Sequence, residues 1–192
     1  GIPANITDRF YLEESVLVTG IVSMLLVAQN NFRLGDIMRA GTNPFLGIEP
    51  GGGNIDAPNI LRTASELRTV SGRKRWSDRI EARRRFIERA HPDDEGSGSR
   101  RAAAESARLK KAMEDLSSLD RLIEPFRLPM TPAEFRRAVV RLCDELGVGG
   151  KVALAGSTGV RAADVEREAR AYAQFLGFMD DFPEVLSRES AA

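Results

Sequence analysis

The longest apolar run, VLVTGIVSMLLVA from Val16 to Ala28, constrains the fold more than any other feature of the chain. It is too short to cross a bilayer, which needs about 20 apolar residues, and it lacks the basic flank and the cleavage site of a signal peptide. Its apolar residues cover more than one side of a helix. We therefore expect a core helix, from about Glu13–Ser15 to Gln29, that other elements surround, and no membrane association.

Apolar residues at helical spacing continue through the rest of the chain. They predict a short helix around Asp36–Arg39 and longer helices over about Ala57–Val70, Arg75–Ala90, Arg100–Ile123, the segment from Thr131 to Gly147, and Ala162–Asp180. Two start signals strengthen this prediction, because Asp56 is a plausible N-cap before Pro58 and Thr131 forms a capping box with Glu134. The fold class is therefore predicted to be mainly α, a multi-helix orthogonal bundle of six or seven helices.

Two segments are candidates for strands. The opening residues, GIPANITDRFYL, alternate well enough for a short N-terminal strand, with apolar Ile2, Ile6 and Phe10 separated by turn-prone residues. KVALA, from Lys151 to Ala155, is the other candidate. It is short and bounded by glycine, so it is a weak partner for the first strand.

The chain offers few groups for catalysis or for binding a metal ion. His91 is its one histidine, which excludes a histidine cluster around a metal. Cys143 is its one cysteine and lies on the inner part of a predicted helix, so it is expected to be a buried small hydrophobe in a reducing, cytoplasmic compartment. The Gly-rich stretch around Lys151 lacks the spacing of a phosphate-binding loop, since Glu145 occupies the position of the first glycine. We expect no catalytic, cofactor-binding or metal-binding residue.

Charge is segregated along the chain although the formal net charge is zero. The segment from Arg62 to Lys111 holds 15 basic and 8 acidic residues, an asymmetry typical of a surface that faces nucleic acid. A solvated pair of helices with salt bridges is the alternative interpretation. The candidate DNA contacts are Arg73, Lys74, Arg75, Arg79, Arg83 and Arg84. Trp76 could stack on a base, but its helical register with Ile80 and Ile87 predicts a place in the core.

The first 47 residues contain several short motifs in a characteristic order. GIP at Gly1–Pro3 is followed by an L-x-E-S helix start at Leu12–Ser15, the apolar helix, Phe32 with Asp36, and an NPF stop at Asn43–Phe45. This order resembles the bacterial helicase and nuclease proteins related to UvrD, most closely the AddB or RecC-like subunits of recombination complexes, in the restriction-endonuclease-like nuclease family. Beyond residue 47 the resemblance is one of composition.

The resemblance implies a domain organisation and a function. Residues 1–47 would be the edge of a second RecA-like helicase domain, with the strand as a remnant of its sheet, so that Gly1 follows a helicase-like strand-and-helix unit. Residues 48–192 would be a helical insertion domain, with a flexible linker near 91–99. The piece would be non-catalytic and would guide DNA or contact a partner helicase-nuclease subunit in double-strand-break processing and recombinational repair. ATP and Mg²⁺ would belong to other parts of the parent ATP-dependent helicase and exodeoxyribonuclease.

A stand-alone helical protein-interaction module without DNA binding is the alternative function. The residues themselves leave both open, because a basic pair of helices serves either purpose.

Overall fold

The computed structural model describes residues 12–48, 54–90, 97–155 and 162–189, which are helical apart from short connections and contain no strand. The prediction of a mainly α fold is confirmed. The α-helices of the described part are α1 (Val16–Gln29), α2 (Leu34–Gly41), α3 (Ala57–Leu67), α4 (Arg73–Ala90), α5 (Ser97–Ile123), α6 (Pro132–Glu145), α7 (Val148–Ala155) and α8 (Ala162–Glu189). Two 3₁₀ turns, η1 (Leu12–Glu14) and η2 (Glu124–Arg127), precede α1 and follow α5.

The two strand predictions have different outcomes, and the number of α-helices differs from the predicted one. The N-terminal strand predicted within Gly1 to Phe10 lies outside the described residues. The alternative strand KVALA is wrong, because these residues belong to α7, where the amide of Lys151 donates an α-helical bond of 3.0 Å to the carbonyl of Gly147. Without a neighbouring strand among the described residues, the backbone polar groups of this segment find their partners locally. This extra helix brings the described part to eight α-helices, rather than six or seven.

The linker predicted near 91–99 is contradicted at its end, where α5 begins. Residues 91–96 lie outside the described residues, but α5 already includes residues 97–99 and so begins three residues earlier than the predicted Arg100. Serine is a residue type that helix starts tolerate well, which is why SGS can open this helix.

Helix starts follow local capping chemistry. The side chain of Asp56 accepts a bond of 2.9 Å from the amide of Asn59, and Pro58 lies in the first turn of α3, as predicted. Thr131 and Glu134 form the predicted capping box at α6. Hydrogen bonds from the backbone and side chain of Thr131 lower the pKa of the Glu134 carboxyl.

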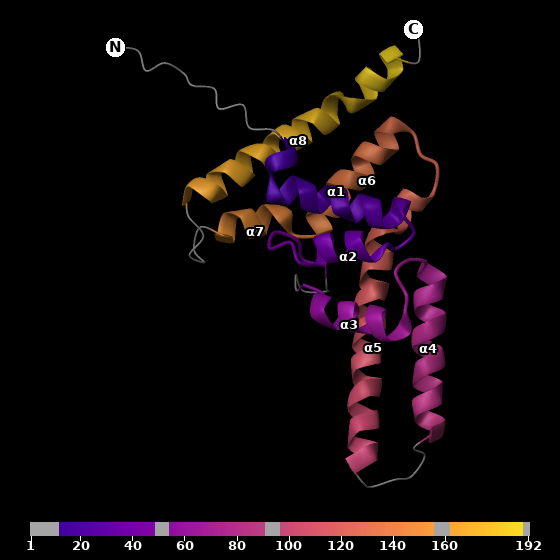
Figure 1. Cartoon of the computed structure of the whole chain (residues 1–192). Coiled ribbons are helices and arrows are strands. Elements are labelled where there is room, and N and C mark those ends of the chain that lie inside the picture. The colour runs from indigo at the N-terminus through magenta and orange to yellow at the C-terminus, as the bar shows by residue number, and fades with distance from the viewer. Residues whose placement is uncertain (1–11, 49–53, 91–96, 156–161, 190–192) are drawn as a thin grey trace.

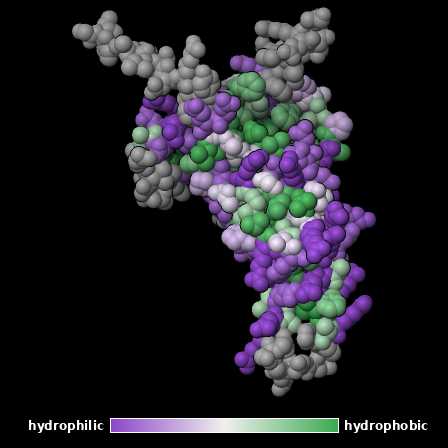
Figure 2. Space-filling model, viewed as in Figure 1, coloured by the Kyte–Doolittle hydropathy of each residue, from purple (hydrophilic) through white to green (hydrophobic). Residues whose placement is uncertain are grey.

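Two parts of the molecule are distinguished in Figure 1. Helices α4 and α5 run side by side in opposite directions and project away from the remaining helices. We call α4 with residues 97–112 of α5 the arm, and α1, α2, α6, α7 and α8 the body. Helix α3 contacts α5 and α2 and so lies where the arm meets the body. Figure 2 shows hydrophilic residues over much of the visible arm surface.

One hydrophobic core runs through the body and into the arm. Fully buried side chains from α1 and α2, such as Leu17, Ile21 and Ile37, belong to the same cluster as Ile80 of α4 and Leu109 of α5. The core therefore joins residues from both segments, 1–47 and 48–192, into which the sequence was divided.

The base of the arm is fixed by Trp76. Its side chain is buried, and its indole Nε1 donates a hydrogen bond of 3.2 Å to the carbonyl of Phe32, so the predicted core role is confirmed. The amide of Gly72 donates to the carbonyl of Asn31 at 2.7 Å. Asn31 and Phe32 both have positive φ angles, of 49° and 59°, which are unusual for residues other than glycine. These contacts hold the connection between α1 and α2 against the start of α4.

The NPF motif has a packing function in the body. Asn43 donates a side-chain hydrogen bond of 2.7 Å to the carbonyl of Val16, and its Oδ1 accepts one of 3.0 Å from the amide of Phe45. A Cβ at Gly20 would lie 2.3 Å from Nδ2 of Asn43. Because Gly20 has no side chain, the side chain of Asn43 can lie directly against the backbone of α1.

Candidate nucleic-acid interface

The six predicted DNA contacts all lie on α4, but they do not share one surface. At about 100° per residue, the buried stripe of Trp76, Ile80 and Ile87 divides them. Arg73 and Arg84 lie on one side of this stripe, Arg79 and Arg83 lie on the other, and Lys74 and Arg75 lie on the outer side of the helix.

Four of the six form hydrogen bonds or ion pairs with other residues of the chain. Arg73 forms an ion pair of 2.7 Å with Asp120 of α5, and Arg84 lies 3.7 Å from Glu88. Arg79 donates hydrogen bonds to the carbonyls of Leu67 and Arg68 at the end of α3. Arg83 pairs with Glu105, as described below. Lys74 and Arg75 are exposed, and neither forms an ion pair with another described residue.

Helix α4 carries a strong excess of positive charge on its surface. It contains eight basic and three acidic residues, and only the three apolar residues of its stripe are buried. The basic side chains of α4 therefore lie outside the core, on both sides of the buried stripe. The surface of α4 thus has a positive electrostatic potential on more than one side.

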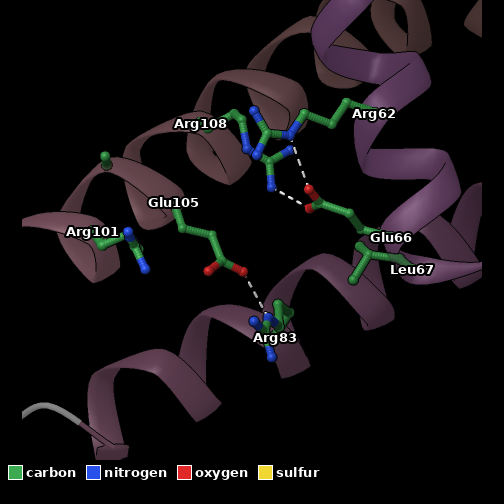
Figure 3. A pocket seen from close by; sticks show the side chains of 8 residues that line it. Arg62, Glu66, Leu67, Arg83, Arg101, Glu105 and Arg108 are labelled. Carbon is green, nitrogen blue, oxygen red and sulfur yellow. Dashed lines mark hydrogen bonds and ion pairs between the residues drawn. The ribbon is translucent and has the colours of Figure 1, made fainter. Parts of the chain in front are cut away.

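A cleft of about 580 Å³ opens between α3, α4 and α5 (Figure 3). The three helices direct charged side chains into it from facing sides, with two apolar residues beside them. The lining consists of Arg62, Glu66 and Leu67 of α3, Arg83 of α4, and Arg101, Ala104, Glu105 and Arg108 of α5. Four guanidinium groups therefore face two carboxylates, and we call this site the arginine cleft.

Glu66 is held by two of the arginines. Arg62 donates to it from Nε at 2.9 Å, and Arg108 forms an ion pair with its other oxygen. Burial disfavours the charged carboxylate, but the hydrogen bonds and charges of Arg108 and Arg62 outweigh burial and lower the pKa of Glu66. Arg108 also donates to the hydroxyl of Thr63 at 3.0 Å, and its side chain is only 16% exposed. The inner end of the cleft is therefore well ordered.

At the other end of the cleft, Arg83 pairs with a carboxylate and Arg101 does not pair with a described residue. Arg83 donates from Nε to Glu105 at 2.7 Å, and this hydrogen bond raises the pKa of the guanidinium above its usual value. Arg101 points into the same region in Figure 3 and forms no hydrogen bond or ion pair within the described ranges. The cleft thus keeps positive charge that no carboxylate of the described ranges neutralises.

Sequence reasoning identified Arg83 but missed its three partners in the cleft. Arg62, Arg101 and Arg108 lie on α3 and α5, and they come together only through packing. The basic segment from Arg62 to Lys111 contains all four arginines. That excess of charge was the one signal in the sequence that pointed to them.

Cys143 is completely buried, as predicted. Burial raises the pKa of its thiol to about 11, although a hydrogen bond with Tyr172 acts in the opposite direction. Because the thiolate is the nucleophilic form of cysteine, Cys143 is a poor nucleophile at neutral pH. Its role is that of a core side chain.

Comparison with known proteins adds no family assignment. None of the protein-family models, curated proteins or solved structures compared with the chain matches it significantly. Across the described ranges, no three His, Cys, Asp or Glu side chains gather as metal ligands would, and no helix has both the length and the apolar character needed to cross a bilayer.

Proposed function

We propose that this chain is a non-catalytic, DNA-contacting module, in which the arm and α3 bind the phosphate backbone. The observation that carries the proposal is the arginine cleft, whose four guanidinium groups exceed its two carboxylates. Guanidinium groups suit phosphate because their N–H groups form a planar fork that matches two phosphate oxygens.

The length and charge of α4 support the same function. An 18-residue helix extends about 27 Å at 1.5 Å per residue, which is comparable with the distance over which duplex DNA presents many phosphates. Those of its eight basic residues that reach the phosphates would release counterions from that stretch of DNA. We therefore expect affinity without strong sequence preference.

The resemblance of the first 47 residues to AddB and RecC-like subunits supplies the proposed setting. In that setting the module guides DNA, or contacts a partner helicase-nuclease subunit, during double-strand-break processing and recombinational repair in the cytoplasm. Residues 1–47 would join it to a RecA-like domain, and residues 48–192 would form the insertion. ATP hydrolysis and strand cutting, with their ATP and Mg²⁺, would take place in other parts of the parent protein.

Fluorescence anisotropy of a labelled duplex, measured over a series of salt concentrations, tests the proposal. We expect the logarithm of the binding constant to fall linearly with the logarithm of the salt concentration. The double variant Lys74→Glu/Arg75→Glu should bind more weakly and with a shallower salt dependence.

The matched control is Arg141→Glu/Arg170→Glu, which makes the same change in net charge on exposed parts of α6 and α8. If both double variants lose affinity equally, the arm is not the contact surface. If the unsubstituted 192-residue chain does not bind the duplex at low salt, the DNA contact itself is refuted.

A helical protein-interaction module is the second candidate, and one observation favours it. The side chains of Leu61, Val70 and Phe86 are half exposed or more, although they are apolar. Arg83 covers part of the Phe86 ring, with its guanidinium carbon 5.3 Å from the ring centroid. This function predicts no affinity for DNA at any salt concentration, so the same titration separates the two candidates.

A further inference from the structure

We infer that the arginine cleft binds a phosphomonoester, the group that ends a nucleic-acid strand or a free nucleotide, in preference to an internal phosphodiester. The inference deepens the proposed DNA contact and rests on it only where the phosphomonoester belongs to a polynucleotide.

The first argument is the balance of charge. Glu66 and Glu105 each neutralise one of the four guanidinium groups that line the cleft, so two positive charges remain. A phosphomonoester carries a charge of about −1.5 to −2 at neutral pH. A phosphodiester in the interior of a strand carries only one negative charge. The terminal group therefore matches the cleft more closely.

The second argument is the supply of hydrogen-bond donors. Arg62 and Arg83 bind their carboxylates through Nε, which leaves their terminal nitrogens able to donate to a ligand. Arg101 donates no hydrogen bond to the described residues, so all its N–H groups are able to donate to a ligand. A phosphomonoester has three terminal oxygens that accept such bonds, and a phosphodiester has two.

The third argument is preorganisation. The arginines stand on three different helices that pack on one another, and Arg108 is fixed by both Thr63 and Glu66. Donors that are already in place lose less conformational entropy when an anion binds. Arg108, whose side chain is 16% exposed, differs in this respect from Arg85 on the outer surface of α4, whose pair with Glu81 is mostly exposed to solvent.

The size of the cleft indicates that more than a phosphate enters. Its volume of about 580 Å³ lies within the range of small-molecule sites, about 300–1,000 Å³. Leu67 and Ala104 provide apolar surface beside the arginines. A nucleoside that carries the phosphate would find room and apolar contact there.

Anisotropy with three internally labelled single strands tests the inference on the 192-residue chain. One strand ends in hydroxyl groups, one carries a 5′-phosphate and one carries a 3′-phosphate. We expect at least one phosphorylated strand to bind about tenfold more tightly than the hydroxyl strand, because a single charge-assisted hydrogen bond is sufficient for that factor. Arg101→Gln should abolish the difference, and the matched variant Arg85→Gln should retain it.

The outcomes separate this inference from the proposed function. If all three strands bind equally and in a salt-dependent manner, the DNA contact stands and the cleft does not bind the end of a strand. Preference for a phosphorylated strand that survives in Arg101→Gln also refutes the cleft as the site.

Isothermal titration with a nucleoside 5′-monophosphate and with the matching nucleoside identifies the source of the ligand. If the monophosphate binds, the nucleoside does not, and Arg101→Gln abolishes the binding, the site is supported. If in addition no strand binds, the ligand is a free nucleotide and the proposed DNA function fails. If neither the monophosphate nor a phosphorylated strand is preferred, the inference is overturned.

Discussion

The hydroxyl of Ser15, at the start of α1, donates a hydrogen bond of 2.6 Å to the carboxylate of Glu168 in α8. The amide of Leu17 donates to the same carboxylate oxygen at 3.0 Å, and Glu168 is only 2% exposed. The first turn of a helix has unpaired N–H groups and the positive end of the helix dipole. A carboxylate from a distant helix therefore completes the cap of α1 and ties α8 to it.

Glu168→Ala should lower the free energy of unfolding by about 1–3 kcal/mol, because it leaves buried donors at Ser15 and Leu17 without an acceptor. Urea unfolding, followed by circular dichroism, measures the change. Glu166→Ala is the matched control, since Glu166 is an exposed residue on the same helix that pairs with the exposed Arg170. Equal losses in the two variants would contradict the importance of the cap.

Gly20→Ala should destabilise the protein although alanine is the better helix former. The new Cβ would meet Asn43 at 2.3 Å and 2.6 Å and would displace the hydrogen bond to Val16. Gly177→Ala, inside α8, is the matched control, because nothing lies within 4 Å of its new Cβ. We expect this control to gain about 0.5–1 kcal/mol. Thermal unfolding should therefore move in opposite directions in the two variants, and a gain in both would contradict the packing described for Asn43.

The ion pairs of Glu66 in the arginine cleft should stabilise the folded protein less as the pH falls. The pKa of Glu66 is lowered in the folded protein, so its contribution to stability is fully present above its ordinary pKa, 4.5, and is lost as the pH falls through the lowered value. Glu66→Gln should therefore flatten the fall in the free energy of unfolding below pH 4.5. Urea unfolding at a series of pH values measures this slope. Arg108→Gln removes a donor to the same carboxylate and should flatten the slope as well, whereas an unchanged slope in both would rule out the role of this ion pair.

Cys143 should react slowly with thiol reagents in the folded protein. With its pKa raised to about 11, the thiolate fraction at pH 8 falls by about two orders of magnitude relative to an ordinary cysteine, and burial slows access further. Labelling in buffer and in urea measures the difference, and the signal is unambiguous because the chain has one cysteine. Rapid labelling without urea would show that this part of α6 opens readily.

Features with a local cause were predictable from the sequence. Asp56 and Thr131 cap their helices because the capping bonds span only a few residues, and Trp76 is buried because the period of its helix places it with other apolar residues. Helix α7 was missed because Gly149 and Gly150 are poor helix formers. Its helical state is supported by contacts with α6 and α8 and by the burial of Val148 and Val152 in the shared core, which a window of sequence does not contain.

The arginine cleft was not predictable in detail, because it depends on contacts across the fold. Arg83 meets Glu105 at a separation of 22 residues, and Arg108 meets Glu66 at a separation of 42. Charge composition located the basic segment but not the arginines that converge within it. The bond between Ser15 and Glu168 had no signal in the sequence, since neither residue belongs to a recognisable pair.

The cap that Glu168 provides also sets an order of events during protein synthesis. The pairing of Arg83 with Glu105 joins residues close in sequence, so the arm can assemble soon after it leaves the ribosome. The cap of α1 has to wait for a residue 153 positions after Ser15. At about 5–20 residues per second, the most apolar helix of the nascent chain waits about 8–30 seconds for its last partner. During that interval its uncovered surface is a natural target for chaperones.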